Sequence, residues 1–537
     1  MKMYARQLES EKAVIKHASD GAVSRSNVNV NEVEWVGETR QGFIQINKAD
    51  NVWICLRDVS KGETIELGGA SVTAKEDIPS GHKMANCFIP EGEDIVKYGF
   101  PIGHATADIE SGQWVHSHNV KTNLDGELAY TYKPVPTDIY PHAKKDSRTF
   151  AGYVRENGDV GVRNEIWIVN TVGCINKVAE QLAKMANQAC RHENVDGVFH
   201  FPHPFGCSQL GDDLVYTQKI LADLVHHPNA GGVLVLGLGC ENNYIELFKE
   251  AIGPYHADRV KFLAVQQVED ELEQGIELIE ELIAYAGQFQ RQEVPVSKLK
   301  VGLKCGGSDG LSGITANPLV GAFSDRLISL GGATVLTEVP EMFGAETILM
   351  ERAKDERVYS QIVDLINDFK QYFAKNEQPI YENPSPGNKK GGITTLEEKS
   401  LGCVQKGGFG RVDDVLQYGD RVRSSGLSLL QGPGNDLVSV TALAASGCQI
   451  VLFTTGRGTP FGGPVPTVKM STHTALYERK KNWIDYNAGQ LVQGATMEEV
   501  SADFFEYVIE LASGRVRTKN ELHGYKEIAI FKDGVTL

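Results

Sequence analysis

The chain contains 537 residues, of which 41% are hydrophobic and 23% are charged. At roughly 100–200 residues per domain, this length predicts about three domains, and the composition is that of a folded protein. With 53 basic and 70 acidic side chains the net charge is −17, which argues against nucleic acid or an anionic membrane as a partner. No segment approaches the roughly 18 consecutive apolar residues of a membrane span. Nine cysteines without a CxxC pair, and no visible secretory signal, indicate a cytoplasmic protein.

The N-terminal part of the chain is predicted to contain an extension, a β domain and a linker. Residues 1–42 are polar and are predicted to form a weakly structured extension. Residues 43–119 contain short strand-like segments separated by Gly-rich turns, which predicts a small all-β domain. Edge strands of such a domain would allow self-association, so a homo-oligomer is an expectation. Residues 120–150 hold three prolines and several charges, as is typical of a linker.

Strand-like and helix-like segments alternate through the rest of the chain. Within residues 151–292, apolar runs such as 165–170 and 232–236 are each followed by a helix-like segment, which predicts parallel βαβ units. A short linker at 291–298 separates this region from a second such domain at 299–537. The predicted fold class is therefore α/β, with a small N-terminal all-β domain followed by two α/β domains that have mostly parallel sheets.

Two Gly-rich segments of the last domain are candidates for a role in binding. Segment 382–392 is polar and too long for a plain connector, so it is a candidate lid. The turn Gly456-Arg-Gly-Thr-Pro-Phe-Gly-Gly follows a predicted strand, and its backbone amides together with Arg457 could bind an oxyanion. The glycine patterns of nucleotide-binding loops are absent from the sequence, so nucleotide binding is not expected.

Cysteines recur near the predicted carboxyl ends of strands, where ligands bind in parallel α/β sheets. Four of them lie in Gly-containing turns, namely Cys174, Cys207, Cys240 and Cys305. Thiolates bind soft metals, so several strand-end cysteines could converge on one metal ion or on an iron–sulfur cluster. Alternatively, these residues are small buried hydrophobes that fill tight turns.

The predicted β domain supplies a second candidate group in Val115-His-Ser-His-Asn. If this segment is a strand, His116 and His118 project from the same face and could bind one cation together. His82 and His104 are further candidates, although a surface role is favoured for His104.

Acidic and amide side chains occupy turns of the two predicted α/β domains. Glu241 and Asn242 lie in Gly239-Cys-Glu-Asn-Asn, and Asp309 lies in Cys305-Gly-Gly-Ser-Asp. Such side chains can transfer protons or bind hydroxyl groups, but they are also common helix caps. The sequence alone leaves both interpretations open.

Several long motifs together carry a family resemblance. They include Val115-His-Ser-His-Asn, Gly206-Cys-Ser-Gln-Leu-Gly-Asp-Asp, Gly239-Cys-Glu-Asn-Asn, Cys305-Gly-Gly-Ser-Asp-Gly-Leu-Ser-Gly-Ile-Thr-Ala-Asn-Pro and Glu338-Val-Pro-Glu-Met-Phe-Gly-Ala-Glu. From residue 43 to the end, the chain resembles the altronate/galactarate dehydratase family of sugar-acid hydro-lyases. Residues 43–119 look like the SAF domain of that family, and the remainder looks like its catalytic region.

The resemblance implies an activity and a cofactor. The motifs at 381–388 and 394–403 look more like the altronate branch, which implies dehydration of D-altronate to 2-dehydro-3-deoxy-D-gluconate. The implied cofactor is iron as Fe²⁺, with Mn²⁺ as a possible replacement. Galactarate or another aldonate or aldarate is the alternative substrate. The alternative of another class is a non-catalytic protein that binds a sugar acid.

The expected site follows from the resemblance together with the strand-end residues. Iron would lie at the strand ends, with Cys207, Cys240 and Cys305 as the favoured sulfur ligands and His116 and His118 as further ligands or proton-transfer groups. Two metal models stay open: a single Fe²⁺ held by histidine and carboxylate oxygen, or an iron–sulfur cluster held by three cysteines. The other expected residues are Glu241 and Asp309 as catalytic groups, Arg163 and Arg457 for the substrate carboxylate, and Asn242 and Asn317 for its hydroxyls.

Overall fold

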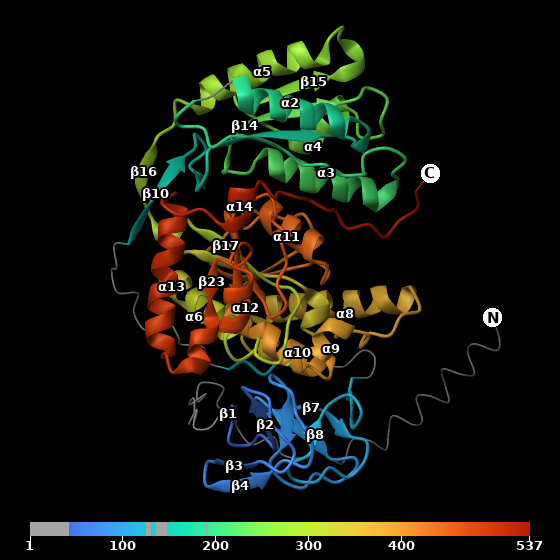
Figure 1. The fold of residues 1–537 in the computed structure, drawn as a ribbon. Coiled ribbons are helices and arrows are strands. Elements are labelled where there is room, and N and C mark those ends of the chain that lie inside the picture. Colours follow the sequence, from blue (N-terminus) through green and yellow to red (C-terminus); the bar gives the residue numbers. More distant parts are fainter. Residues whose placement is uncertain (1–41, 125–129, 136–147, 190–191, 537) are drawn as a thin grey trace, which may run out of the picture.

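The computed structural model describes residues 42–536 apart from 125–129, 136–147 and 190–191. The predicted N-terminal extension therefore lies outside the described residues except for Gly42, and so does most of the predicted linker at 120–150. The β domain (43–121) lies at one end of the molecule, the third domain (296–536) lies in the middle, and the second domain (149–295) lies at the other end (Figure 1). No helix among the described residues is long and apolar enough to span a membrane.

The β domain is built from short antiparallel strands, as predicted. In its described residues they form three sheets with the orders β1 (Phe43–Ile44)–β2 (Val52–Cys55)–β5 (Lys83–Ala85)–β8 (Trp114–Val115), β3 (Thr64–Leu67)–β4 (Ala70–Thr73), and β6 (Asp94–Lys97)–β7 (Phe100–Ala105)–β9 (Val120–Lys121). In β3, alternate side chains are buried, which is the pattern expected of a strand with one face on a core. Trp53, Ile65 and Met84 belong to that core.

The second domain contains a parallel sheet covered by helices on both faces. Its four described strands have the order β13 (Val198–His200)–β12 (Glu165–Asn170)–β14 (Ala230–Gly237)–β15 (Val260–Ala264). One face packs on α2 (Asn176–Ala189) and α5 (Glu271–Ala286), and the other packs on α3 (Gly211–Val225) and α4 (Ile245–Ile252). Strand β14 is buried along its whole length, as expected for a parallel strand between two helical layers.

The prediction of a linker at 291–298 is wrong for residues 291–295. Arg291–Pro295 form strand β16, which pairs antiparallel with β10 (Thr149–Val154), and β10 also pairs with β11 (Val160–Gly161). The chain therefore leaves the second domain beside the strand by which it enters. Only Val294 of β16 is buried, so this edge strand has no alternation of apolar and polar residues for sequence analysis to detect.

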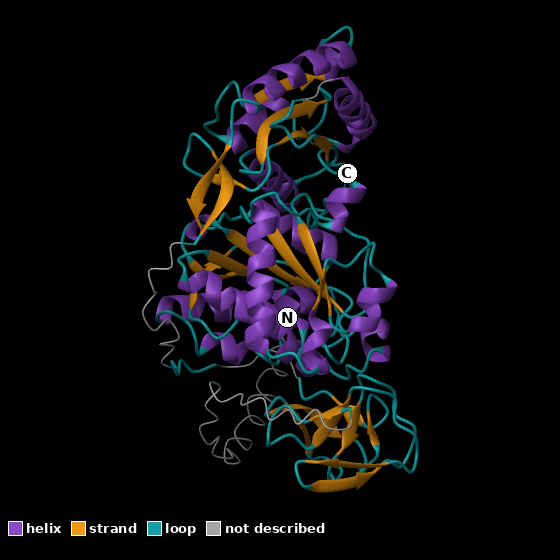
Figure 2. Ribbon diagram, turned by 60° about the vertical axis from the view of Figure 1, so that its left-hand side comes forward, coloured by secondary structure: helices purple, strands orange, loops and turns teal. Residues whose placement is uncertain are grey.

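The third domain contains a larger parallel sheet, which Figure 2 shows between its helices. Seven described strands have the order β19 (Val412–Leu416)–β20 (Gly426–Leu430)–β18 (Ala333–Leu336)–β17 (Lys300–Cys305)–β21 (Ile450–Thr455)–β22 (Thr467–Ser471)–β23 (Tyr486–Asn487). The longer helices are α6 (Ala316–Ser329), α8 (Glu356–Lys375), α11 (Asp436–Ala445) and α13 (Met497–Ala512). This sheet and that of the second domain confirm the predicted α/β class with an N-terminal β domain.

A buried ion-pair network joins the β domain to the third domain. Glu398 of helix α10 (Leu396–Cys403) lies 2.8 Å from the ammonium groups of both Lys83 and Lys97. These three side chains are at most 1% exposed. Lys83 also donates to the backbone carbonyl of Gly392 at 2.7 Å. Burial acts to raise the pKa of Glu398, but the two lysine charges outweigh it and hold the pKa well below its ordinary value.

Replacing Glu398 by Gln is expected to lower the free energy of unfolding by about 3–5 kcal/mol at neutral pH, because two buried ammonium groups lose their charged partner. The pKa of Glu398 is depressed in the folded state, so its stabilising contribution is present above the ordinary glutamate pKa of about 4.3 and is lost as the pH falls below it. The stability difference between wild type and variant should therefore shrink on acidification.

Urea unfolding of both proteins, at neutral pH and at pH about 4, measures this difference. The exposed Glu382→Gln is the matched control and should be indistinguishable from wild type at both pH values. A Glu398→Gln protein as stable as wild type at neutral pH would show that the network does not hold the domains together.

Candidate active site

The seven-stranded sheet has a topological switch point at its centre. From β17 the chain continues to β18 on one side, and it returns much later to β21 on the other side. Ligands of open parallel sheets bind beyond the carboxyl ends of strands at such a point. The loops that follow β17 and β21 carry Asp309 and Arg457, respectively. Two of the residues predicted from sequence therefore meet at the position that the topology favours.

A cavity of about 420 Å³ lies at this position. Asp309, Arg457 and His473 line it from the loops after β17, β21 and β22. The β domain contributes Ser80 and Gly81 to the wall, so the cavity lies between two domains. Its lining residues are Leu56, Ser80, Gly81, Asp309, Leu311, Lys390, Gly391, Gly456, Arg457, His473, Thr474, Ala475, Gly489, Val492 and Gln493.

The Asp309 carboxylate is held by a set of hydrogen bonds. One oxygen accepts from the Leu311 amide and the Ser312 hydroxyl, each at 3.1 Å, and the other accepts from the Thr472 hydroxyl at 2.9 Å. Burial raises the pKa of Asp309, although the nearby His473 opposes this effect. A carboxyl group whose pKa is raised and which borders a cavity is suited to proton transfer.

His473 and Arg457 flank this carboxylate with basic groups. His473 Nε2 lies 3.9 Å from Asp309 Oδ2, and His473 Nδ1 accepts from the Leu476 amide, which fixes the ring. The Arg457 side chain is exposed at the cavity, and within the described residues its guanidinium has no hydrogen-bond or ion-pair partner. An arginine available in this way can bind a carboxylate through two parallel hydrogen bonds.

The segment predicted as a lid packs against the cavity wall. Ser385 caps the short helix α9 (Pro386–Lys390), and the side-chain amide of Asn388 donates from Nδ2 to the Ser308 carbonyl at 2.8 Å. At its end, the Gly391 carbonyl accepts from the Gly310 amide at 2.8 Å. The segment thus lies directly on the loop that carries Asp309.

Glycines permit the close approach of the β domain to this segment. A Cβ on Gly310 would lie 1.9 Å from the Gly81 carbonyl oxygen, and a Cβ on Gly392 would lie 2.3 Å from the same atom. Gly392 has φ of +103°, which L side chains rarely adopt. These two positions therefore require glycine for the domains to meet.

Behind Asp309 lies a small polar void that reaches a buried thiol–carboxylate group. Asp309 and Cys403 both line this void. The Sγ atoms of Cys305 and Cys403 are 3.3 Å apart, and each lies 3.1 Å from Glu341 Oε2. Lys399 donates to Glu341 Oε1 at 2.8 Å. Burial acts to raise the pKa of Glu341, but nearby lysine charges, above all that of Lys399, outweigh it and hold the pKa well below its ordinary value.

The donor atoms of Cys305, Glu341 and Cys403 all lie within 4.8 Å of one another. Among the described residues, no other group of three or more acidic, histidine or cysteine side chains has its donors this close together. Two sulfurs and a carboxylate oxygen are donors that iron accepts. The group therefore fits a single iron ion in donor chemistry and in spacing. A metal at this position would share the Glu341 carboxylate with the Lys399 ammonium group.

The metal ligands predicted from sequence do not all come together at one point. Cys305 lies in the third domain, whereas Cys207 and Cys240 are exposed at the edge of the second domain, and His116 and His118 belong to the β domain. The five residues supply no shared group of closely spaced donors within the described chain. The single ligand set expected from sequence is therefore not formed.

His116 and His118 do not project from one strand face, because strand β8 ends at Val115. They lie in the turn before β9, in which the Asn119 amide donates to the His116 carbonyl at 3.0 Å. The ring of His116 is stacked on Trp114 at 5.2 Å, and that of His118 lies 5.5 Å from Trp114 at a tilt. Burial and the nearby Lys83 charge lower the pKa of His116 to about 3.

Asn317, Glu241 and Asn242 all have protein partners. Asn317 lines the small void, where it accepts from Thr454 and donates to the Gly402 carbonyl. Glu241 and Asn242 lie instead in the second domain. There Glu241 accepts from the Thr171 hydroxyl and from two backbone amides of its own loop.

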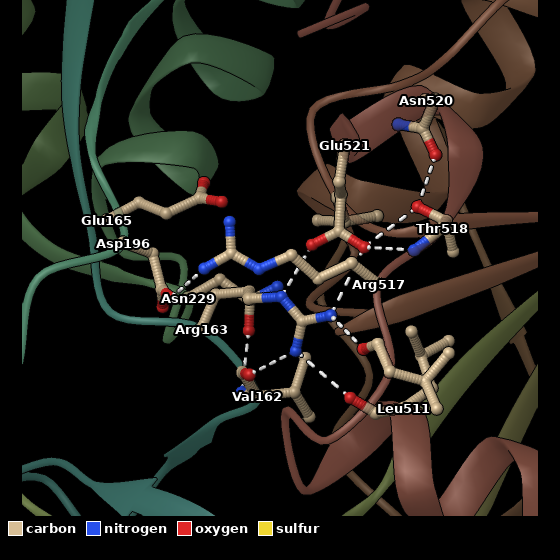
Figure 3. Close-up of polar contacts among 12 residues, drawn as sticks. Val162, Arg163, Glu165, Asp196, Asn229, Leu511, Arg517, Thr518, Asn520 and Glu521 are labelled. Atoms are coloured by element: carbon tan, nitrogen blue, oxygen red, sulfur yellow. Dashed lines mark hydrogen bonds and ion pairs between the residues drawn. The ribbon is translucent and has the colours of Figure 1, made fainter. Parts of the chain in front are cut away.

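Arg163 lies in the joint between the second and third domains (Figure 3). It forms a buried ion pair with Glu521 of helix α14 (Lys519–His523), and its remaining N–H groups donate to the carbonyls of Val162, Leu511 and Val516. Arginine has five N–H donors, and these contacts use all of them. The substrate contact predicted for Arg163 is thus replaced by a contact between domains.

Comparisons with known proteins agree with this architecture. Three family models match the chain: "Altronate/galactarate dehydratase SAF domain" at 41–123, "D-galactarate dehydratase/Altronate hydrolase, second domain" at 152–287, and "D-galactarate/Altronate dehydratase, C-terminal" at 296–536. The chain belongs to the altronate/galactarate dehydratase family. The β domain is therefore the SAF domain of this family, as the sequence motifs indicated.

Three relatives align over most of the chain. It is 57% identical to the altronate dehydratase of Bacillus subtilis (strain 168) over 93% of its length and 100% of the relative. It is 51% identical to the altronate dehydratase of Escherichia coli (strain K12) over 92% of its length and 100% of the relative. Identity to the galactarate dehydratase (L-threo-forming) of E. coli (strain K12) is 33%, over 91% of this chain and 96% of that protein.

No role was predicted from sequence for His473, Glu341 or Cys403. His473 follows β22 by two residues, so its position beyond the end of a parallel strand was a usable signal. Cys403 lies at the end of α10, and Glu341 lies in a short helical turn after β18. Their proximity to Cys305 arises from tertiary packing alone.

Replacing Glu521 by Gln is expected to lower the free energy of unfolding by about 3 kcal/mol, because Arg163 would keep its buried charge without a charged partner. The KM for the substrate should stay unchanged, since Arg163 faces the joint between domains. Urea unfolding and steady-state kinetics measure the two effects. Glu510→Gln, which removes an exposed ion pair with Arg515, is the control. A raised KM at unchanged stability would instead assign Arg163 to substrate binding.

Proposed function

We propose that this protein is a hydro-lyase that converts D-altronate to 2-dehydro-3-deoxy-D-gluconate and water. Its similarity to two altronate dehydratases extends over their full length, whereas identity to the galactarate dehydratase is much lower. The structural observation that carries the proposal is the convergence of Asp309 and Arg457 on one cavity at the switch point of the sheet. A cavity of about 420 Å³ has room for a six-carbon sugar acid.

The proposed roles follow from the chemistry of dehydration. The reaction removes a weakly acidic proton next to the carboxylate and expels the hydroxyl group of the neighbouring carbon. Arg457 would bind the carboxylate, which places the acidic carbon beside Asp309. Asp309 would accept the proton from the carbon next to the carboxylate and deliver it to the departing hydroxyl group, which leaves as water, and the resulting enol would tautomerise to the 2-keto acid. His473 would keep the Asp309 carboxylate oriented and polarised.

We also propose iron as the metal of this reaction, with Mn²⁺ as a possible replacement. Cys305, Glu341 and Cys403 would hold it, because their donors fit iron in type and spacing. When bound, the metal would supply positive charge that stabilises negative charge on substrate oxygens. We place the enzyme in the reducing cytosol, since the exposed cysteines of the described structure are unpaired.

Turnover of a panel of aldonates and aldarates tests the substrate. The purified chain is incubated with Fe²⁺, and the 2-keto acid product is measured for D-altronate, galactarate and related acids. We expect the highest kcat/KM for D-altronate. A higher kcat/KM for galactarate would show that the protein is instead an aldarate dehydratase. Binding of an acid without turnover would favour a non-catalytic sugar-acid-binding protein.

Two variants separate the proposed roles. Asp309→Asn should lower kcat by about 10²–10⁴-fold, because the proton-transfer group is lost. Arg457→Gln should raise KM by about 10–100-fold, because a hydrogen-bonded ion pair with the carboxylate is lost. Arg423→Gln, at an exposed arginine elsewhere on the third domain, is the matched control and should leave both parameters unchanged. Full activity of Asp309→Asn would exclude it as the proton-transfer group.

A further inference from the structure

Three adjacent loops of the second domain carry the same dipeptide, Gly-Cys. Gly173-Cys174 follows β12, Gly206-Cys207 lies between β13 and α3, and Gly239-Cys240 follows β14. Strands β13, β12 and β14 are neighbours in one parallel sheet, so the three loops emerge at the same edge. All three cysteines are exposed and unpaired.

Backbone hydrogen bonds hold these loops against one another. The Gly173 amide donates to the Phe205 carbonyl at 2.8 Å, which joins the Cys174 loop to the Cys207 loop. The Asn243 amide donates to the Gly206 carbonyl at 3.1 Å, which joins the Cys207 loop to the Cys240 loop. The Ser208 amide also donates to Asn242 Oδ1 at 2.7 Å. The loop that carries Cys207 is thus fixed to both of its neighbours.

The glycines show how tightly this edge is built. A Cβ on Gly206 would lie 1.9 Å from the Thr171 carbonyl oxygen, and a Cβ on Gly173 would lie 2.4 Å from the His203 carbonyl oxygen. Ser208, directly after Cys207, has φ of +57°, a value uncommon for a residue other than glycine. Strained backbone of this kind clusters at binding and catalytic sites.

Glu241, which was predicted from sequence to be catalytic, instead fixes the loop that carries Cys240. The Glu241 carboxylate accepts from the Thr171 hydroxyl of the neighbouring strand end and from the backbone amides of Leu238 and Gly239. Glu241 therefore positions Cys240 relative to β12. Gln266, which follows the neighbouring strand β15, donates to the Cys240 sulfur at 3.6 Å.

We propose that Cys174, Cys207 and Cys240 bind an iron–sulfur cluster at this edge. Cysteine thiolates on rigid loops are the usual protein ligands of such clusters. Three thiolates would leave one iron of a four-iron cluster without a cysteine ligand. This set differs from the one predicted from sequence, which was Cys207, Cys240 and Cys305. Cys174 replaces Cys305, because Cys305 lies in another domain.

This site is separate from the cavity that contains Asp309. The cluster loops belong to the second domain, whereas Asp309 and the buried Cys305 belong to the third domain. The proposal therefore does not depend on the role of Asp309. Asp309→Asn is expected to lose turnover and to retain the cluster, so that failure of one proposal leaves the other testable.

The test begins with the full chain purified without oxygen from cells grown with iron. Iron and acid-labile sulfide are measured per chain, together with visible absorption and the electron paramagnetic resonance spectrum after reduction. We expect about four labile sulfides per chain with the spectrum of a cluster, and about four iron, or about five where the separate Cys305 site also holds its ion. Iron or zinc bound without labile sulfide, or no bound metal, would overturn the proposal.

Cysteine variants test the ligand set. Cys174→Ser, Cys207→Ser and Cys240→Ser should each remove most of the labile sulfide while the melting temperature of the metal-free chain stays close to wild type. Cys87→Ser, at an exposed cysteine of the β domain, and Cys305→Ser should both retain the cluster. Retention in the Cys174 variant, or loss in the Cys305 variant, would contradict the assignment.

Alkylation of the wild-type chain gives a second measurement that does not depend on variants. Iodoacetamide should label Cys87 in the cluster-containing protein but leave Cys174, Cys207 and Cys240 unmodified. After the cluster is removed by oxidation and chelation, Cys87 and the three loop cysteines should all be labelled, as mass spectrometry would show. Equal labelling of the three loop cysteines before and after removal would exclude them as ligands.

Discussion

The ion-pair network of Glu398 with Lys83 and Lys97 determines where the β domain sits on the third domain. Charges removed from water are costly unless their partners are held in good geometry, so the network favours one docked arrangement over displaced ones. In that arrangement the Gly81 backbone reaches Gly310 and Gly392, where side chains would collide. The cavity wall formed by Ser80 and Gly81 exists only when this interface is closed. The candidate active site is thus a property of two docked domains.

Periodic patterns made the architecture of the chain predictable. Buried parallel strands such as β14 are continuous apolar runs, and Gly-rich turns mark their ends. Because ligands bind at the carboxyl ends of parallel strands, the strand-end rule also indicated Asp309 and Arg457. It could not indicate which of two parallel sheets carries a given site. Strand order does not decide this either, because β12 in the four-stranded sheet and β17 in the seven-stranded sheet both have the next strand of the chain on one side and a later strand on the other. The choice depends on which loops surround the cavity, and those are the loops after β17, β21 and β22.

Local patterns failed where tertiary contacts decide a residue's role. An arginine beside Asn164 and Glu165 looks like an anion-binding group, but Arg163 meets Glu521 more than 350 positions later in the chain. His116 and His118 alternate as strand residues do, yet the strand ends one residue earlier and they occupy a turn. Cys305 resembles the other strand-end cysteines in sequence, while its neighbour Cys403 is 98 residues away. In each case, the partner that defines the role is invisible to a short window of sequence.

Because the net charge of the chain is −17, attraction of an anionic substrate requires positive side chains close to the site. Most buried lysines near the site do not provide this attraction, because each is held in an ion pair with a carboxylate: Lys399 with Glu341, and Lys83 and Lys97 with Glu398. Lys390 and Arg457 differ, since both are exposed at the cavity and neither has an ion-pair partner within the described residues. Their charges act across a concave, partly desolvated surface, where the field is stronger than on an open one. These two side chains therefore supply positive charge at the cavity, against the sign of the whole molecule.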